Sequence, residues 1–187
     1  MGDHALGCPK YGERIARHDR LRDVLFETAA SAALGPTREG RHLLPGTVAR
    51  PADVLIPRWR DGKDCALDIT VTSPLAPSNL AAAAAEAGGA LAKAFHRKVQ
   101  GAGEVCRQQG LAFVPVALET LGGFHPVAEA EVKKLGVALA RHTGQDEQDA
   151  VRHLFQRLSL CLMRGNSVLL TSRCLPQDVP AEIDGIK

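Results

Sequence analysis

The sequence predicts an α/β domain in which a small mixed sheet is flanked by helices. Three observations support this fold class. Apolar residues recur at helical spacing in several stretches, and three shorter apolar stretches are typical of strands. The strands come as a hairpin, then a helix, then a third strand, an order that requires a crossover helix. With 187 residues, 45% of them apolar, the chain is long enough to bury one such core.

The N-terminal part contributes one predicted helix. Residues 1–15 are rich in glycine and proline and are not expected to join the core. Apolar spacing predicts a helix over 19–34, with Asp19 as its N-cap and Gly35-Pro36 as its end. This helix precedes the sheet in the chain.

A hairpin is predicted next, and it carries two acids. Apolar strands are expected at 54–56 and 66–71, and the Asp61-Gly62 dipeptide between them favours a turn. Asp53 stands where the first strand begins, Asp68 lies inside the second, and fourteen residues separate them. Folding at the turn would bring the two carboxylates together, as in sites that hold Mg²⁺ for phosphodiester chemistry.

The middle of the chain predicts the crossover and the third strand. An alanine-rich helix is expected over 79–100, in which Gly88-Gly89 favours a kink or a break. The apolar segment 111–119 is typical of a buried strand. Pro115 cannot donate a ladder hydrogen bond, so this strand is expected at an edge or a bulge.

The C-terminal part predicts two more helices. One is expected at about 126–142, ended by Gly144, and another over 147–163, capped by Asp146 and marked by an apolar stripe. A weak strand is predicted at 167–172, and the proline-containing end of the chain is expected to be loose. The final helix is interpreted as part of the core and not as a partner-binding face.

Composition limits the function classes. Lys and Arg exceed Asp and Glu by only two, so no global positive field indicates a nucleic-acid partner. Any basic surface must therefore be local. The sequence has one such cluster near its start: Arg14, Arg17, Arg20 and Arg22.

The cysteines and the hydropathy pattern favour an intracellular protein. The five cysteines are widely spread and odd in number, and Cys65 and Cys161 lie in apolar surroundings typical of free buried thiols. The sequence contains no signal peptide pattern and no stretch near the roughly 20 apolar residues of a membrane span.

Asp68 is the most unusual residue of the predicted strands. An aspartate amid apolar residues is costly to bury unless it is paired or binds a metal. Strand alternation puts Asp68, Thr70 and Thr72 on one face and Leu67, Ile69 and Val71 on the other. By spacing alone, Asp68 could equally point to solvent or pair with a nearby arginine.

A family resemblance adds to this pattern. The motif Arg-Pro-x-Asp at 50–53, the fourteen-residue gap and Asp-Ile-Thr-Val at 68–71 resemble the restriction-like endonuclease domain of site-specific non-LTR retrotransposons. That domain belongs to the PD-(D/E)XK nuclease superfamily. Further pieces match in the family's order: Arg17-His18-Asp19, Leu21-Arg22-Asp23, Lys93 to Lys98, Val114-Pro115-Val116 and Gly122-Gly123.

The resemblance implies roles for particular residues. Asp53 and Asp68 would ligate Mg²⁺ or Mn²⁺, together with the Ile69 carbonyl. The superfamily normally places a lysine two residues after the second acid, and here that position is Thr70. Lys98 is predicted to replace it as the third catalytic residue, with Lys93 as the runner-up, although either lysine alone would be typical of a solvated helix face. The DNA contacts implied are Arg17, His18, Arg22 and Arg50.

His18 and the accessory acids keep more than one interpretation. His18 could contact DNA, support the two acids, or simply be a polar residue at a helix start. Asp23 and Glu119 are weaker candidates for an accessory ligand.

The resemblance also implies a domain organisation. Residues 1–16 would be the remnant of a zinc knuckle or linker, and 17–125 a restriction-endonuclease-like core. Residues 126–173 would form a C-terminal helical extension, followed by a loose tail at 174–187. His4 and Cys8 supply at most two zinc ligands, so no closed structural zinc site is expected. The chain would be a detached C-terminal piece of a polyprotein, without its reverse transcriptase and with an incomplete knuckle.

Three functions are compatible with the sequence. The first is a metal-dependent endonuclease that nicks DNA, which would act in the nucleus. The second is a catalytically inactive relict that keeps the nuclease fold and at most weak DNA binding, which Thr70 and the near-neutral charge favour. The third is a helical interaction module without a nucleic-acid role.

Overall fold

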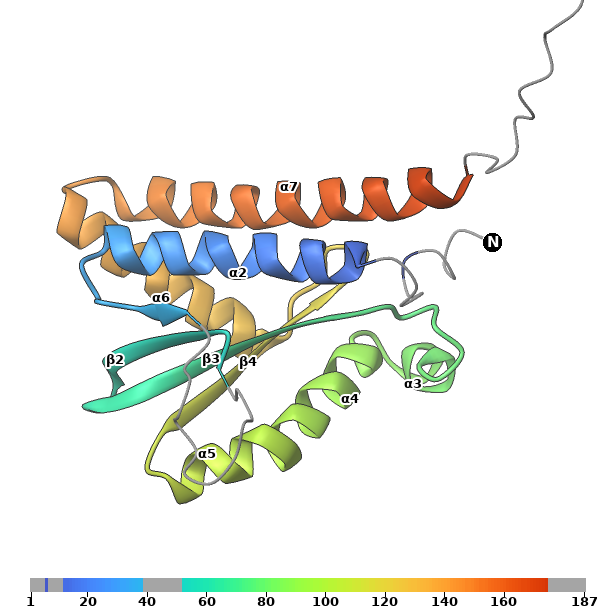
Figure 1. The fold of residues 1–187 in the computed structure, drawn as a ribbon, viewed down its shortest axis with the longest axis horizontal. Helices are drawn as coiled ribbons and strands as arrows, with labels where there is room; N and C mark the ends of the chain where they lie inside the picture. Colours follow the sequence, from blue (N-terminus) through green and yellow to red (C-terminus); the bar gives the residue numbers. More distant parts are fainter. Residues whose placement is uncertain (1–5, 7–11, 39–51, 175–187) are drawn as a thin grey trace, which may run out of the picture.

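The computed structural model describes residues 6, 12–38 and 52–174. Within these residues the strands form one four-stranded sheet in the order β1-β2-β3-β4 (Figure 1). The strands are β1 (Thr37–Arg38), β2 (Val54–Arg60), β3 (Lys63–Thr72) and β4 (Ala112–Glu119). The β1–β2 and β2–β3 pairs are antiparallel, whereas β3 and β4 run parallel. The predicted mixed sheet is therefore confirmed.

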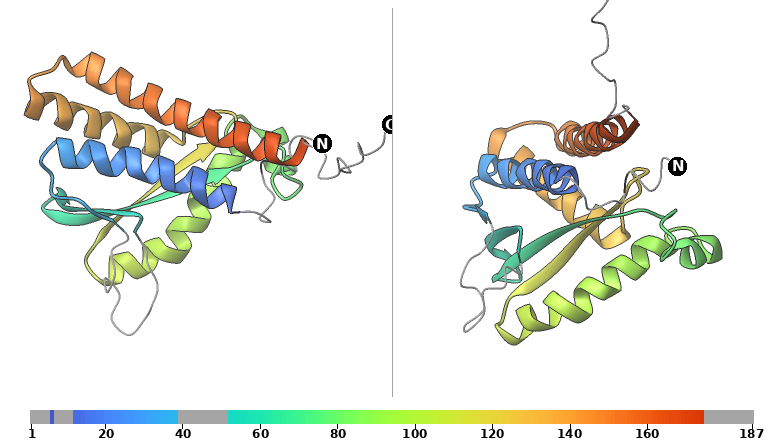
Figure 2. Two further views of the ribbon diagram at one scale, coloured as in Figure 1. Left: turned by 45° about the horizontal axis from the view of Figure 1, so that its top comes forward. Right: turned by 45° about the vertical axis from the view of Figure 1, so that its right-hand side comes forward.

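Helices cover both faces of this sheet. On one face lie α2 (Glu13–Ser31), α6 (Pro126–Thr143) and α7 (Glu147–Cys174), as Figures 1 and 2 show. The other face carries the crossover from β3 to β4. It consists of α3 (Leu80–Ala85), α4 (Gly89–Lys98), a π-helical turn η1 (Val99–Gly103) and α5 (Glu104–Gln108). The prediction of helices flanking a small sheet is thus confirmed as well.

The two faces are packed to different extents. The main core lies between the sheet and α2, α6 and α7, and it includes Leu21, Leu67, Val116, Leu135 and Leu158. A much smaller cluster on the crossover face joins Ala52, Ala66 and Cys106. In the predicted C-terminal extension α6 packs on β4, and α7 lies across α2 and α6 and adds leucines to the main core.

The β2–β3 hairpin folds where the sequence predicts. Its turn is at Asp61-Gly62, and both residues have positive φ, as a tight hairpin turn requires. The two strands are longer than expected, because β2 continues to Arg60 and β3 begins at Lys63. At the other end of the hairpin, β2 begins at Val54, which pairs with Leu67. The strand β3 continues beyond this pair to Thr72.

The crossover breaks at the predicted glycines. Gly88 has a φ of 79°, and a Cβ on Gly89 would lie 2.0 Å from the Ala82 carbonyl oxygen. The chain therefore turns sharply between α3 and α4 and starts a new helix. Pro115 lies in β4, which is the last strand of the sheet, so its predicted edge position is confirmed.

Two sequence predictions about helices are wrong. The first helix begins at Glu13 and not at Asp19, because Gly12 adopts a left-handed conformation (φ 73°) that starts the helix six residues earlier. The predicted strand at 167–172 is the continuation of α7, which runs to Cys174. Leu158, Leu162 and Leu169 are buried at helical spacing, whereas Val168 is exposed.

Three thiols within the described residues are free. Cys65 and Cys106 are buried, and Cys161 is only partly buried. Burial raises the pKa of the Cys65 thiol to about 12. None of the helices in the described ranges combines the length and apolar character that a membrane span needs. The predictions for His4, Cys8, Arg50 and residues 175–187 lie outside the described residues.

Candidate functional site

Asp53 immediately precedes β2, and its carboxylate lies at the edge of β3 that β2 leaves unpaired. The Asp53 N–H donates to the Leu67 carbonyl at 2.9 Å, and its side-chain Oδ2 accepts from the Ile69 N–H at 2.7 Å. The carboxylate thus takes the place of the next β2 backbone group and lies beside the residue that follows Asp68. Because the N–H and C=O of one strand residue point to the same side, the Ile69 carbonyl faces this edge too.

Asp68 pairs with Lys98 from the crossover face. The Lys98 Nζ donates to Asp68 Oδ1 at 3.1 Å and lies 2.9 Å from Oδ2. Burial is the main cause that raises the pKa of Asp68 above its usual range, and the negative charge of Asp53 adds to it. Lys98 opposes this rise without cancelling it. The two acids are neighbours, because Asp53 Oδ2 accepts from the N–H of Ile69, the residue after Asp68.

One oxygen of Asp68 has an unmet hydrogen-bonding capacity. Oδ2 is buried, and despite its closeness to Lys98 it is in hydrogen-bonding geometry with no group of the described structure. The Lys98 ammonium supplies a counter-charge 2.9 Å away, and Oδ2 keeps lone pairs that a further cation could share. Carboxylate and carbonyl oxygens are the donors that Mg²⁺ prefers. Asp53, Asp68 and the Ile69 carbonyl therefore fit a hard divalent cation.

The two predicted lysines differ in where they point. Lys98 is the last residue of α4, immediately before η1, and it reaches Asp68. Such π-helical turns are rare and recur at functional sites. Lys93, one and a half turns earlier, donates to the Ser78 carbonyl instead. Of the two, Lys98 is the lysine that the fold brings to the acids.

His18 reaches the acids from α2. Its Nε2 lies 3.1 Å from Asp53 Oδ2, and its Nδ1 lies 3.4 Å from Asp19 Oδ1. The bond to Asp53 is the largest cause that raises the pKa of His18, while burial partly opposes it. The interpretation of His18 as a support for the acids therefore agrees with its position.

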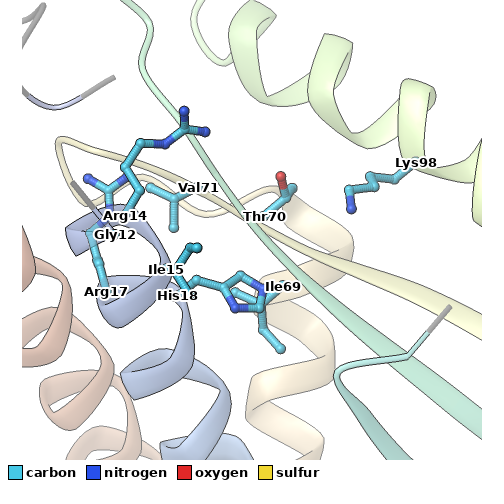
Figure 3. Close-up of a pocket in the computed structure, with 9 residues that line it drawn as sticks. All are labelled: Gly12, Arg14, Ile15, Arg17, His18, Ile69, Thr70, Val71 and Lys98. Carbon is cyan, nitrogen blue, oxygen red and sulfur yellow. The ribbon is translucent and has the colours of Figure 1, made fainter. Parts of the chain in front are cut away.

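A cleft of about 370 Å³ opens beside these groups (Figure 3). In the figure α2 contributes Arg14 and His18 to one side, β3 contributes Ile69 and Thr70, and Lys98 extends from α4 on the other side. Thr70, at the position where the predicted resemblance would require a lysine, lines the cleft with no charge of its own. Lys98 supplies the positive charge from another element.

Arg17 has a structural role in the described fold. It is 3% exposed, and its Nη1 donates to Asn166 Oδ1 at 2.7 Å, while Asn166 donates to the Thr120 carbonyl. Burial lowers the pKa of Arg17 to about 10. A Cβ on Gly165 would lie 2.5 Å from Arg17 Cγ, so α7 approaches α2 closely at this point. Arg17 also lines the cleft beside His18, so its predicted DNA contact stays a prediction.

Arg22, another predicted DNA contact, is held by two acids of its own helix and not by Asp53 or Asp68. Arg22 donates to Asp19 at 3.0 Å and to Asp23 at 3.1 Å. Asp23 also pairs with Arg38, so this weak ligand candidate is held by two arginines. Glu119 ends β4 next to the turn at Gly122-Gly123.

The Arg17–Asn166 contact and the π-helical turn are not predicted from the sequence. Arg17 and Asn166 are 149 residues apart, and no local pattern links them. The π-helical turn has only Gly101 and Gly103 as a local signal, and such glycines are common in ordinary loops.

Comparisons with known proteins do not assign a family. No protein-family model matches the sequence, and no curated protein matches it significantly. The nuclease resemblance therefore stays a prediction, and the geometry of the candidate site is what any functional proposal must rest on.

Proposed function

We propose that this domain is a metal-dependent DNA endonuclease of the restriction-endonuclease-like type, which nicks DNA with Asp53, Asp68 and Lys98. The observation that carries the proposal is the convergence of these three side chains from the residue before β2, from β3 and from α4. Their fold supports the same conclusion, since a hairpin, a crossover helix and a parallel strand surround the site.

The residues divide the chemistry among them. Asp53, Asp68 and the Ile69 carbonyl would hold Mg²⁺ or Mn²⁺. A cation of this kind lowers the pKa of bound water and stabilises negative charge on the phosphate. Lys98 balances the charge of buried Asp68 and provides an ammonium group at the cleft that can orient a water molecule. Lys98 would thereby supply the positive charge that Thr70 lacks.

The cleft has groups suited to a phosphate. Lys98 and Arg14 lie on opposite sides of it, so two cationic side chains border the cleft although the net charge of the chain is only +2. A local patch of this kind positions a nucleic-acid backbone without reading its sequence. DNA is the partner proposed for this surface.

One observation favours an inactive nuclease-fold relict as the second candidate. Each acid already has a partner from another element, because Asp68 pairs with Lys98 and Asp53 with His18. A charge network of this kind can persist for structural reasons alone. A relict would keep the fold and at most weak DNA binding, but it would not cleave.

A supercoiled-plasmid nicking assay separates the two functions. The wild-type protein with Mg²⁺ or Mn²⁺ should convert supercoiled plasmid to the open circle, and EDTA should stop it. Asp68→Ala should leave the plasmid supercoiled, whereas Lys93→Ala should nick as the wild type does, because Lys93 contacts Ser78 and not the acids. Equal nicking by the wild type and Asp68→Ala, or none by either, would overturn the endonuclease.

A further inference from the structure

We infer that His18 is a positioning residue that holds Asp53 in the orientation needed to bind the divalent cation. This inference rests on the proposed function and extends it to a residue outside the ligand set. His18 belongs to α2, whereas Asp53, Asp68 and Lys98 come from other elements. The helix α2 would therefore also contribute to the site.

The hydrogen bonds of Asp53 are the basis of this role. Its Oδ2 is approached by two groups, the Ile69 N–H at 2.7 Å and the His18 Nε2 at 3.1 Å. Its Oδ1 accepts from no group in the described part of the chain. Two donors on one oxygen fix the rotation of a carboxylate and leave the other oxygen available to a cation.

His18 is itself aimed by the packing of α2. Consecutive residues of a helix point about 100° apart, so Arg17 and His18 face different neighbours. Arg17 is buried against α7 by its bond to Asn166 and by the close approach of Gly165. This contact fixes the turn of α2 that carries His18. The imidazole consequently lies beside Asp53, at the start of β2.

Loss of the imidazole should weaken cation binding. Without it, Asp53 would keep only the Ile69 N–H, a single donor about which the carboxylate can rotate. Partners that orient metal ligands typically contribute about 10-fold to 100-fold to metal affinity. We expect a loss of that size when His18 is replaced by a residue that cannot donate.

A matched pair of substitutions tests the donor. His18→Leu removes it with little change in volume, whereas His18→Gln retains an N–H group on a side chain of similar reach. Mn²⁺ binding to the full chain, measured by calorimetry without DNA, should be about 10-fold to 100-fold weaker in His18→Leu than in the wild type. His18→Gln should recover much of the loss. The exposed His153→Leu is the control and should bind as the wild type does.

The outcomes separate this inference from the nuclease function. Equal Mn²⁺ affinity in the wild type and His18→Leu would overturn it, as would equally weak binding by His18→Leu and His18→Gln when both are folded. If binding follows the expected order but no protein nicks DNA, the inference stands and the endonuclease fails. A wild-type protein that binds no Mn²⁺ would overturn both.

Discussion

The two faces of β3 differ in the side chains that they carry. On the face toward α2, α6 and α7, Leu67 and Ile69 are each 2% exposed within the main core. On the face toward α4, Asp68 pairs with Lys98, and Thr70 lines the cleft. Because side chains alternate along a strand, one short sequence supports the fold on one side and offers polar chemistry on the other.

The stability of the domain comes mainly from the face of β3 toward α2. Apolar burial on the α2 face is favourable, whereas burial of the Asp68 carboxylate disfavours its charged form and raises its pKa. Residues one position apart should therefore respond in opposite ways to substitution. Those on one face should affect folding, and those on the other should affect the site.

The largest expected effect is on activity, in Asp68→Asn. Nicking should fall to the level seen without metal, because a cation ligand is lost. The free energy of unfolding at pH 7 should be kept or increased, since the substitution removes a buried charge that burial disfavours. Plasmid nicking and urea denaturation check the two parts. Loss of both activity and stability would contradict the division between the faces.

Lys98→Ala should reduce the nicking rate next most strongly. Removal of one preorganised electrostatic group from a site costs about 100-fold to 1000-fold in rate, and Lys98 is the cation in contact with Asp68. Lys93→Ala, on the same helix, should change the rate little. Single-turnover nicking at saturating metal measures both variants, and a similar effect of the two lysines would disprove the assignment of Lys98.

Leu67→Ala should destabilise the fold through the other face. Leucine-to-alanine changes in a packed core cost about 2–5 kcal/mol, and Leu67 is 2% exposed within the main core. Leu160→Ala is the matched control, because Leu160 is 55% exposed on α7 and should cost less than about 0.5 kcal/mol. Urea denaturation gives both values. Equal costs would mean that the α2 face is not the main core.

The smallest expected effect is a pH dependence of stability. The pKa of Asp68 is raised in the folded state, so its contribution to stability is fully present below the unfolded pKa of about 4. That contribution is lost as the pH rises through the folded pKa. Relative to Asp68→Asn, the wild type should therefore become less stable from about pH 4 toward neutral pH, in denaturation without metal. A difference that stays constant across this range would show that the Asp68 pKa is not raised.

The sequence predicts the sheet well because its signals there are local. Alternating apolar residues and the Asp61-Gly62 turn define the hairpin, and the hairpin alone brings Asp53 to Asp68. The end of α7 is mispredicted because Ser167 to Ser172 has strand-like composition, whereas the tertiary contacts of Asn166 and Leu169 keep it helical.

The candidate site is predictable only in part. The Lys98 contact is expected through the family resemblance, since nothing in the local pattern distinguishes Lys98 from Lys93. The His18–Asp53 bond joins residues 35 positions apart through the packing of α2 on the sheet. Side-chain contacts of this kind depend on the assembled fold and carry no periodic signal in the sequence.

The location of Mn²⁺ in crystals grown with this ion would test the account most directly. An anomalous difference map reports the ion without reference to activity or DNA. We predict a peak between the carboxylates of Asp53 and Asp68, next to the Ile69 carbonyl, and its loss in Asp68→Asn. A saturating concentration of Mn²⁺ that leaves no peak between these two residues would contradict the proposed site.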